Sequence, residues 1–407
     1  MRVYALIFLI WLGSPWSLLG ATYYVATTGS DSDPGSQARP FKTLNRAFGA
    51  LKAGDTLYIR GGVYTETTAN FQNIIGGDSW STATTVAAYP GETVTIRPSS
   101  DTPTGRLAHF YGPNSHYIII DGLILDAINV SADACRINDE LGTGRAHHIR
   151  IKNSELKNAR GNGCKVDGIG NEFINDKIHD NATFDFKPYG HGLYISASDN
   201  LVDGCLIYNN GGGNYASGVE AYLGALSASS PVDNIVVRNN TIYGHRFGAG
   251  IQLWNGSNDQ AYNNVVYSNG GGIDVGTGAS NTQIFNNTVY SNVAYAIQVH
   301  NSANTVIRNN ITWLNGGAQP VTDAGSATYS QDHNITTDPL FVNPATGDFR
   351  LSSTNSPAYD GGVTISVVTS DKVGITRPQG TGYDVGAFEY PLGTLTLLPP
   401  QNLRIAP

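Results

Sequence analysis

The sequence has little of several residue types, and each scarcity excludes a class of protein. Its 407 residues include one Met and only 14% charged residues, which argues against long helices or a coiled coil. The formal net charge is −8 at pH 7 without any run of Lys and Arg, so electrostatics give no reason to expect nucleic acid or an anionic membrane as a partner. The 40% of hydrophobic residues suffice for a sizeable core, which excludes disorder over most of the chain.

Cysteine is also scarce. Three Cys residues leave at least one unpaired, and no C-x-x-C motif or Cys/His pair has the spacing of metal ligands. We therefore expect no metal and no redox motif at these positions. Cys135, Cys164 and Cys205 are predicted to be buried free thiols that pack as small apolar residues.

The first 21 residues have the pattern of a signal peptide. Arg2 supplies a positive charge, residues 4–12 form a short apolar run, and Gly20 and Ala21 offer a cleavage site. The alternative is a single membrane anchor, but this run is short, and no other apolar run approaches the roughly 18 residues that a spanning helix needs. We expect a secreted protein, extracellular or periplasmic, that is monomeric and free of the membrane after cleavage.

Glycine and asparagine are abundant, with 48 Gly and 37 Asn, and the asparagines recur at a fixed period. Pairs of Asn stand at 239/240, 263/264, 286/287 and 309/310, with spacings of 24, 23 and 23 residues. Such a period with short alternating strands is typical of a solenoid. The Leu pattern of leucine-rich repeats is absent, so the β-branched, Tyr and Asn content favours a parallel β-helix with three strands per coil. Stacked Asn residues at its turns can adopt the αL conformation and hydrogen-bond to one another.

Both ends of the repeat region resemble a known group of proteins. Residues 22–66 (TYYVATTGSDSDPG…GGVYTE) resemble the opening of secreted bacterial right-handed β-helix proteins, which include pectate-lyase-like and chondroitinase-B-like polysaccharide lyases. Residues 338–362 and 377–390 resemble the closing segment of the same group. The resemblance implies a capping helix over residues 41–51. It also implies Lys or Arg as a base, frequently with calcium held by clustered acids; no tight Asp cluster is present, so we expect no cofactor, with calcium as the alternative.

We therefore predict an all-β fold: a single-stranded right-handed parallel β-helix of roughly ten coils with an N-terminal α-helical cap. This domain is expected to span residues 22–390, between the signal peptide and a flexible C-terminal tail at 391–407.

Alternation along one strand of each coil predicts which side chains face outward. The inward positions are apolar in every coil: Cys135, Cys164, Leu193, Val219, Ile251, Ile273 and Ile297. One outward row then reads Arg136, Lys165, Tyr194, Glu220, Gln252, Asp274 and Gln298, and the neighbouring row reads Asn138, Asp167, Ser196, Tyr222, Trp254, Gly276 and His300. Such a continuous surface of charged, amide and aromatic groups is suited to a long polysaccharide.

The first chemistry that this surface permits is β-elimination from an acidic, uronate-containing polysaccharide, which we consider the main hypothesis. A cation neutralises the sugar carboxylate, a base removes the neighbouring proton, and an acid protonates the leaving oxygen. Arg136 and Lys165 are the candidates for the first two roles, and Tyr194 with His191 for the third. His191 is nominally inward, so its role requires a bend at residues 190–192.

Two other functions remain open. Glu220 and Asp274 lie two coils apart, about 9.6 Å, near the upper limit for an inverting glycoside hydrolase. Alternatively, the same face belongs to a glycan-binding surface protein without catalysis. In the lyase hypothesis the substrate-binding residues are Asp167, Glu220, Tyr222, Gln252, Trp254, Asp274 and His300. Inserts at 137–146, 183–190 and 224–233 bracket the first coils of the row and predict the walls of a cleft there.

Overall fold

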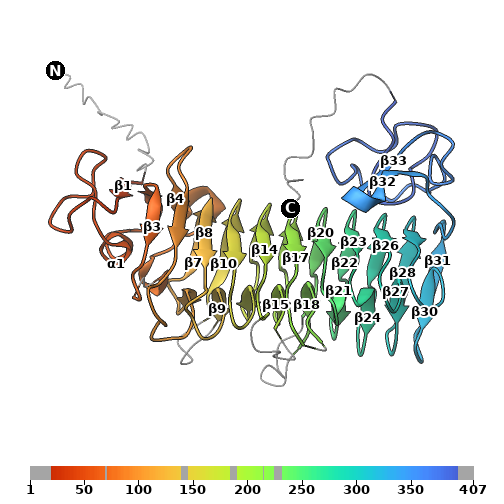
Figure 1. The fold of residues 1–407 in the computed structure, drawn as a ribbon, viewed down its shortest axis with the longest axis horizontal. Helices are drawn as coiled ribbons and strands as arrows, with labels where there is room; N and C mark the ends of the chain where they lie inside the picture. Colours follow the sequence, from red (N-terminus) through yellow and green to blue (C-terminus); the bar gives the residue numbers. More distant parts are fainter. Residues whose placement is uncertain are drawn as a thin grey trace, which may run out of the picture.

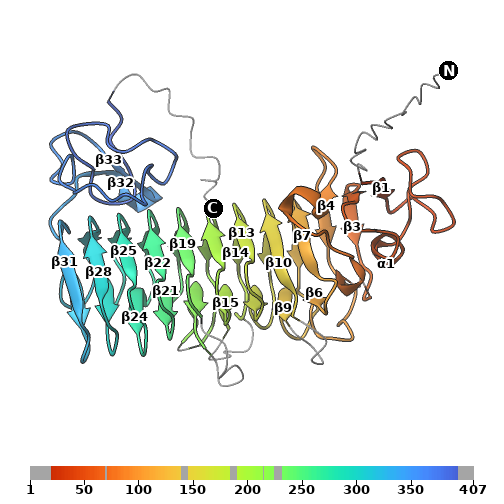
Figure 2. The same cartoon turned by 180° about the vertical axis from the view of Figure 1, so that it is seen from behind.

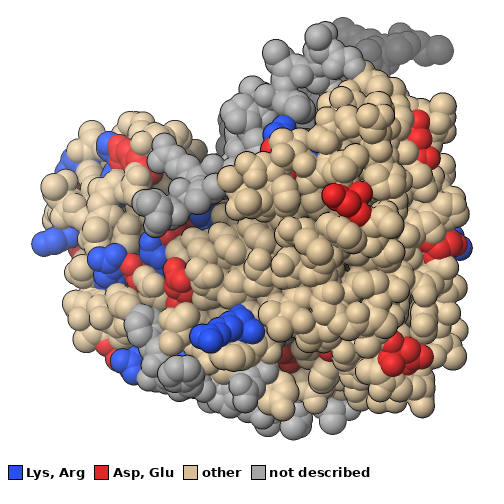
Figure 3. All heavy atoms as spheres, turned by 45° about the vertical axis from the view of Figure 1, so that its right-hand side comes forward, with Lys and Arg blue, Asp and Glu red and all other residues tan. Residues whose placement is uncertain are grey.

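The computed structural model describes residues 20–68, 71–138, 145–183, 190–213, 215–223 and 232–392. The predicted signal peptide and tail lie almost wholly outside the described residues, as do most residues of the three predicted inserts. Within the described ranges, no helix is long and apolar enough to cross a membrane. Most of the face drawn in Figure 3 carries neither basic nor acidic side chains, in keeping with the low charge content.

The chain winds into a β-helix with three long parallel sheets (Figure 1). The first sheet contains, in order, β1 (Thr22–Val25), β2 (Thr56–Ile59), β4 (Thr84–Ala88), β7 (His116–Asp121), β10 (His147–Lys152), β13 (Glu172–Ile174), β16 (Leu201–Asp203), β19 (Val236–Arg238), β22 (Gln260–Tyr262), β25 (Gln283–Phe285), β28 (Thr305–Arg308) and β31 (Tyr329–Asp332). The second contains β3 (Gly62–Tyr64), β5 (Val94–Ile96), β8 (Leu123–Asp126), β11 (Glu155–Lys157), β14 (Lys177–His179), β17 (Leu206–Tyr208), β20 (Thr241–Tyr243), β23 (Val265–Tyr267), β26 (Thr288–Tyr290) and β29 (Ile311–Trp313).

The third sheet carries the predicted outward rows. Its strands are β6 (Ala108–Tyr111), β9 (Cys135–Asn138), β12 (Cys164–Val166), β15 (Leu193–Ile195), β18 (Val219–Ala221), β21 (Ala249–Trp254), β24 (Gly271–Gly276), β27 (Ile297–Val299) and β30 (Val321–Asp323). The first sheet has twelve strands, so the helix is slightly longer than the ten coils expected. The three sheets enclose one continuous apolar core.

The predicted inward stack is confirmed. Cys164 pairs with Cys135 on one side and Leu193 on the other, and the same register continues through Val219 to Ile297. All of these side chains are buried, and Cys135, Cys164 and Cys205 are free thiols, as predicted. Cys205 precedes β17 and so belongs to another part of the coil.

The two residues of each asparagine pair have different roles at the turn between the first and second sheets. The first Asn of each pair, such as Asn263 and Asn286, has a positive φ of 54° and 49° and turns the chain. The second is buried and continues a ladder: Asn264 donates its backbone N–H and its side-chain amide to Asn287 Oδ1, both at 3.0 Å. Asn287 does the same to Asn310. Both predicted uses of Asn are thereby confirmed.

The helix expected over residues 41–51 is shorter in the structure. Helix α1 (Leu44–Phe48) has five residues, begins after the N-cap Thr43 and ends at Gly49. Its buried side chains Leu44, Ala47 and Phe48 belong to the main core, and Phe48 contacts Phe71 in the short helix η1 (Phe71–Asn73). A second short helix, η2 (Trp80–Thr82), follows in the same region.

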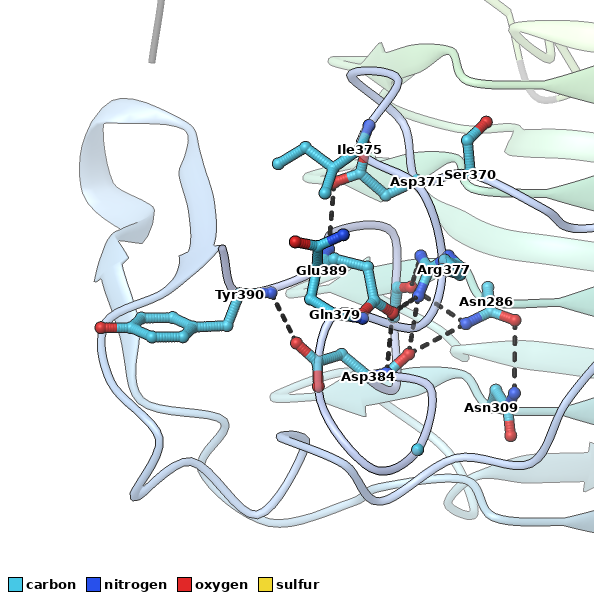
Figure 4. Close-up of polar contacts among 12 residues, drawn as sticks. Asn286, Asn309, Ser370, Asp371, Ile375, Arg377, Gln379, Asp384, Glu389 and Tyr390 are labelled. Carbon is cyan, nitrogen blue, oxygen red and sulfur yellow. Dashed lines mark hydrogen bonds and ion pairs between the residues drawn. The ribbon is translucent and has the colours of Figure 1, made fainter. Parts of the chain in front are cut away.

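The segment after β31 turns back along the coil. It contains β32 (Phe341–Asn343), η3 (Pro344–Thr346) and β33 (Asp348–Leu351), and it lies on the side of the coil away from the third sheet (Figures 1 and 2). Figure 4 shows it against the asparagine turn, where Asn286 donates its side-chain amide to the carbonyls of Asp384 and Gly386. The Arg377 guanidinium donates to the same two carbonyls. This guanidinium is fully buried with Glu389 at 2.5 Å, and it also donates to Asn263 Oδ1.

Candidate functional site

The outward row on the third sheet exists as predicted. Lys165 pairs in register with Arg136 and Tyr194, and the row continues without a break through Glu220, Gln252, Asp274 and Gln298. Parallel strands repeat at about 4.8 Å, so each member of the row lies one such step from the next. The apolar residues on either side of each member point into the core and fix its outward direction.

Arg136 is held by two carboxylates at the N-terminal end of the row. Its Nη2 lies 2.8 Å from Asp167 Oδ2, and its Nη1 lies 3.7 Å from Asp133 Oδ2. The guanidinium is only 14% exposed. Arg136 thus holds a fixed positive charge beside Lys165, and this guanidinium already interacts with two carboxylates. Its predicted contact with a sugar carboxylate stays a prediction.

Lys165 has a different environment. Its amine lies 5.1 Å from the ring centroid of Tyr194 and makes no hydrogen bond or ion pair with any other residue in the described ranges. Burial lowers the pKa of Lys165, and the charge of Arg136 lowers it further, against the opposing effect of Asp167 and Asp133. A lysine with a lowered pKa and a free amine is suited to act as a base.

Tyr194 is the next residue of the row. Burial raises the pKa of its phenol, and the nearby carboxylates, first Glu220, add to this effect. The hydroxyl therefore keeps its proton at neutral pH, beside the amine of Lys165. This is the state that a proton donor needs.

His191 is buried beside the outward row, with its ring centroid 5.4 Å from that of Tyr194. It is 1% exposed, its Nδ1 accepts the Ser217 backbone N–H at 3.0 Å, and Glu220 Oε2 lies 3.0 Å from the same nitrogen. Burial lowers the pKa of His191 to about 3, so the ring is neutral. Its contact with Glu220 makes it a support for that residue, and a direct catalytic role stays a prediction.

Glu220 carries a proton in this arrangement. Because His191 Nδ1 accepts the Ser217 N–H, that nitrogen carries no hydrogen and offers no donor to a Glu220 carboxylate. Burial, with the charge of Asp274 as a smaller cause, raises the pKa of Glu220 to about 8. Glu220 is therefore a neutral carboxylic acid at pH 7.

Asp274 lies two strands farther along the sheet. His300 Nε2 is 3.2 Å from Asp274 Oδ1, and this interaction raises the pKa of His300. Trp254 contacts both His300 and Tyr222 with perpendicular rings, at 5.3 and 5.7 Å between centroids. Tyr222 and Trp254, both predicted to bind substrate, thus form a corner rather than one flat surface. Gln252, between the two acids, accepts a hydrogen bond from Ser217 Oγ at 3.2 Å.

Calcium, the alternative cofactor, does not fit these residues. It takes about six to eight oxygen ligands. Across the described ranges, no group of three or more His, Cys, Asp and Glu side chains could hold a metal ion. The carboxylates nearest the proposed base, Asp133 and Asp167, both face the guanidinium of Arg136. We derive no step of the chemistry through calcium.

Comparison with known proteins agrees with this architecture. The family model described as "Pel9A-like, right handed beta helix region" matches residues 23–225, which include Arg136, Lys165, Tyr194 and Glu220. A further model of a right-handed β-helix region matches residues 219–338. Among solved structures, pectate lyase Pel9A is similar over 91% of this chain and 96% of its own, with a TM-score of 0.64 and 18% identity. XylC in complex with xylose is similar over 91% and 99%, with a TM-score of 0.52 and 12% identity.

Curated relatives match shorter stretches. The uncharacterized protein YwoF of Bacillus subtilis is 29% identical over 144 residues, which are 34% of this chain and 29% of the relative. Pectate lyase PEL9 of Emericella nidulans is 38% identical over 80 residues, which are 20% of this chain and 19% of the relative. The chain thus matches less than a third of the length of either protein. Taken together with the fold, these matches show that the chain belongs to the pectate-lyase-like right-handed parallel β-helix proteins.

Sequence reasoning missed two residues of this site. Asp133, three positions before Arg136, could have been found as the nearest acid to a predicted outward Arg. Ser217 could not, because its role comes from a backbone N–H that meets His191 from the adjacent coil.

Proposed function

We propose that this chain is a secreted enzyme that cleaves an acidic, uronate-containing polysaccharide by β-elimination, with Lys165 as the base. The observation that carries the proposal is the free amine of Lys165, in register between Arg136 and Tyr194, with a lowered pKa. Pectate lyases among the similar proteins, and the Pel9A-like family match over this region, support the same class of substrate. Secretion rests on the sequence pattern of residues 1–21.

The row supplies the parts of the reaction in order. The amine of Lys165, in its deprotonated form, removes the proton next to the sugar carboxylate, and the positive charge of Arg136 on the adjacent strand stabilises the negative charge that develops. The electrons form the new carbon–carbon double bond and break the bond to the leaving oxygen. Tyr194, which keeps its proton at neutral pH, lies one strand farther and donates that proton to the leaving oxygen.

Incubation of the protein with pectate, alginate and glycosaminoglycans tests the proposal. Elimination leaves an unsaturated uronate at the new non-reducing end, and this product absorbs ultraviolet light. We expect this absorbance to rise with at least one polymer. New reducing ends without absorbance would contradict elimination, and neither signal on any polymer would favour a binding protein.

Hydrolysis is the second candidate because of Glu220. A buried carboxyl that keeps its proton at pH 7 is suited to be the general acid of an inverting hydrolase. Asp274 would then be the base, two strand spacings or about 9.6 Å away. The assay above separates the two candidates, since hydrolysis gives reducing ends alone.

A further inference from the structure

The outer surface of the third sheet changes its charge along the axis of the coil. Its two outward rows contain Arg136 on β9 and Lys165 on β12. From β15 to β27 neither row contains a Lys or Arg, and the members are Tyr194, Glu220, Gln252, Asp274, Gln298, Ser196, Tyr222, Trp254, Gly276 and His300. Lys and Arg are therefore confined to the first strands of the site, and farther along the imidazole of His300 is already paired with Asp274.

A buried donor without a partner lies on β21, beside the carboxylate of Asp274 on β24. Trp254 Nε1 is buried and donates no hydrogen bond, whereas Asp274 Oδ1 lies 3.2 Å from His300 Nε2. Buried polar atoms are normally paired, so the unpaired N–H of Trp254 indicates a missing ligand. The ligand must offer a hydrogen-bond acceptor to Trp254, and a donor on it can share the carboxylate of Asp274.

Gly276 lets these groups converge. It pairs in register with Trp254, and a Cβ atom added to it would lie 2.7 Å from Trp254 Nε1 and 2.2 Å from His300 Nε2. Any side chain at this position would therefore push the two rings away from the sheet. The absence of a side chain leaves the rings close to the backbone beside Asp274.

We propose that this surface, formed by Glu220, Trp254, Asp274 and His300, is a subsite for an uncharged sugar, which we call the neutral subsite. Sugar hydroxyls both donate and accept, so they satisfy Asp274 and Trp254 together. A second uronate at this position would bring its carboxylate to that of Asp274 with no Lys or Arg in the rows to offset it. Resting on the proposed function, the inference is that the substrate alternates uronate with neutral sugars and is not a polymer of uronate alone.

Binding to an inactive variant tests this inference. Lys165→Ala prevents turnover, so affinity can be measured by calorimetry for two hexasaccharides: one of alternating galacturonic acid and rhamnose, and one of galacturonic acid alone. We expect the alternating hexasaccharide to bind at least about tenfold more tightly. Adding Asp274→Asn should weaken binding of the alternating sugar, because it replaces one charged acceptor oxygen with an NH2 donor. It should strengthen binding of the homogeneous sugar, because it removes repulsion.

Asp323→Asn is the matched control, since Asp323 is an exposed acid on β30 of the same sheet. In the Lys165→Ala background it should leave the ratio of the two affinities within about twofold, an effect expected of a rim charge. The inference is overturned if the homogeneous hexasaccharide binds as tightly as the alternating one, if Asp274→Asn leaves the ratio unchanged, or if neither sugar binds. The proposed lyase activity is tested separately: it fails if the wild-type protein produces no ultraviolet absorbance from either polymer.

Discussion

Removal of the buried Arg377 should strongly destabilise the returning C-terminal segment. The side chains of Arg377 and Glu389 are both 0% exposed, and the guanidinium also donates to the carbonyls of Asp384 and Gly386 (Figure 4). Arg377→Met keeps a long side chain but removes the positive charge from the buried Glu389 carboxyl, which keeps the backbone N–H groups of Gln379 and Asp384 as donors. Breaking a buried pair in this way costs about 3–5 kcal/mol, because an uncompensated charge remains in the protein interior.

Urea denaturation measures this loss, and limited proteolysis after β31 shows whether the segment detaches before the coil unfolds. The double variant Arg377→Met with Glu389→Met should lose less stability than Arg377→Met alone, since it removes the unpaired carboxyl. Arg308→Ala is the control, because its pair with Asp332 is about 40% exposed and should contribute at most about 1 kcal/mol. A loss below about 1 kcal/mol for Arg377→Met would refute the reasoning.

Three further predictions follow from the ladder and the site. Asn287→Ala should lower the free energy of unfolding by about 2–3 kcal/mol in urea denaturation, because it leaves the buried amides around it unpaired. The pKa of Glu220 rises from 4.5 to about 8 on folding, so the unfolded state loses this proton at a lower pH than the folded state. The free energy of unfolding of the wild-type protein should therefore fall relative to that of Glu220→Gln between about pH 5 and 8, and urea denaturation at both pH values checks the sign. Trp254→Ala should raise KM about tenfold with little change in kcat, since it removes a sugar contact without a reacting group; equal losses in kcat would argue against that role.

Periodicity made the fold and the row predictable. Each coil repeats the same alternation, so a residue such as Lys165 could be placed beside Arg136 and Tyr194 from spacing alone. The asparagine turns were predictable for the same reason. Because the register of a solenoid is set by its repeat, an error of one residue would have turned every inward side chain outward.

What spacing could not give were contacts between residues far apart in sequence. Arg377 reaches Asn263 across 114 residues, and no local pattern marks that pairing. His191 was nominally inward by alternation, but its partners Ser217 and Glu220 come from the next coil. The raised pKa of Glu220 follows mainly from its burial, which spacing does not give. The helix α1 is shorter than the capping helix over residues 41–51 that the family resemblance implied, because it begins after Thr43 and ends at Gly49.

The most direct test of the central claim is the turnover of Lys165→Ala, measured by ultraviolet absorbance on the polymer that the wild-type protein cleaves. Lys152→Ala is the control, since Lys152 lies on the first sheet in an ion pair with Asp121. We predict that Lys165→Ala lowers kcat by at least about a thousandfold, as expected for loss of a reacting base, while Lys152→Ala leaves it unchanged. Full turnover by Lys165→Ala, together with its loss in Glu220→Gln, would contradict the account and assign the reaction to the carboxyl groups.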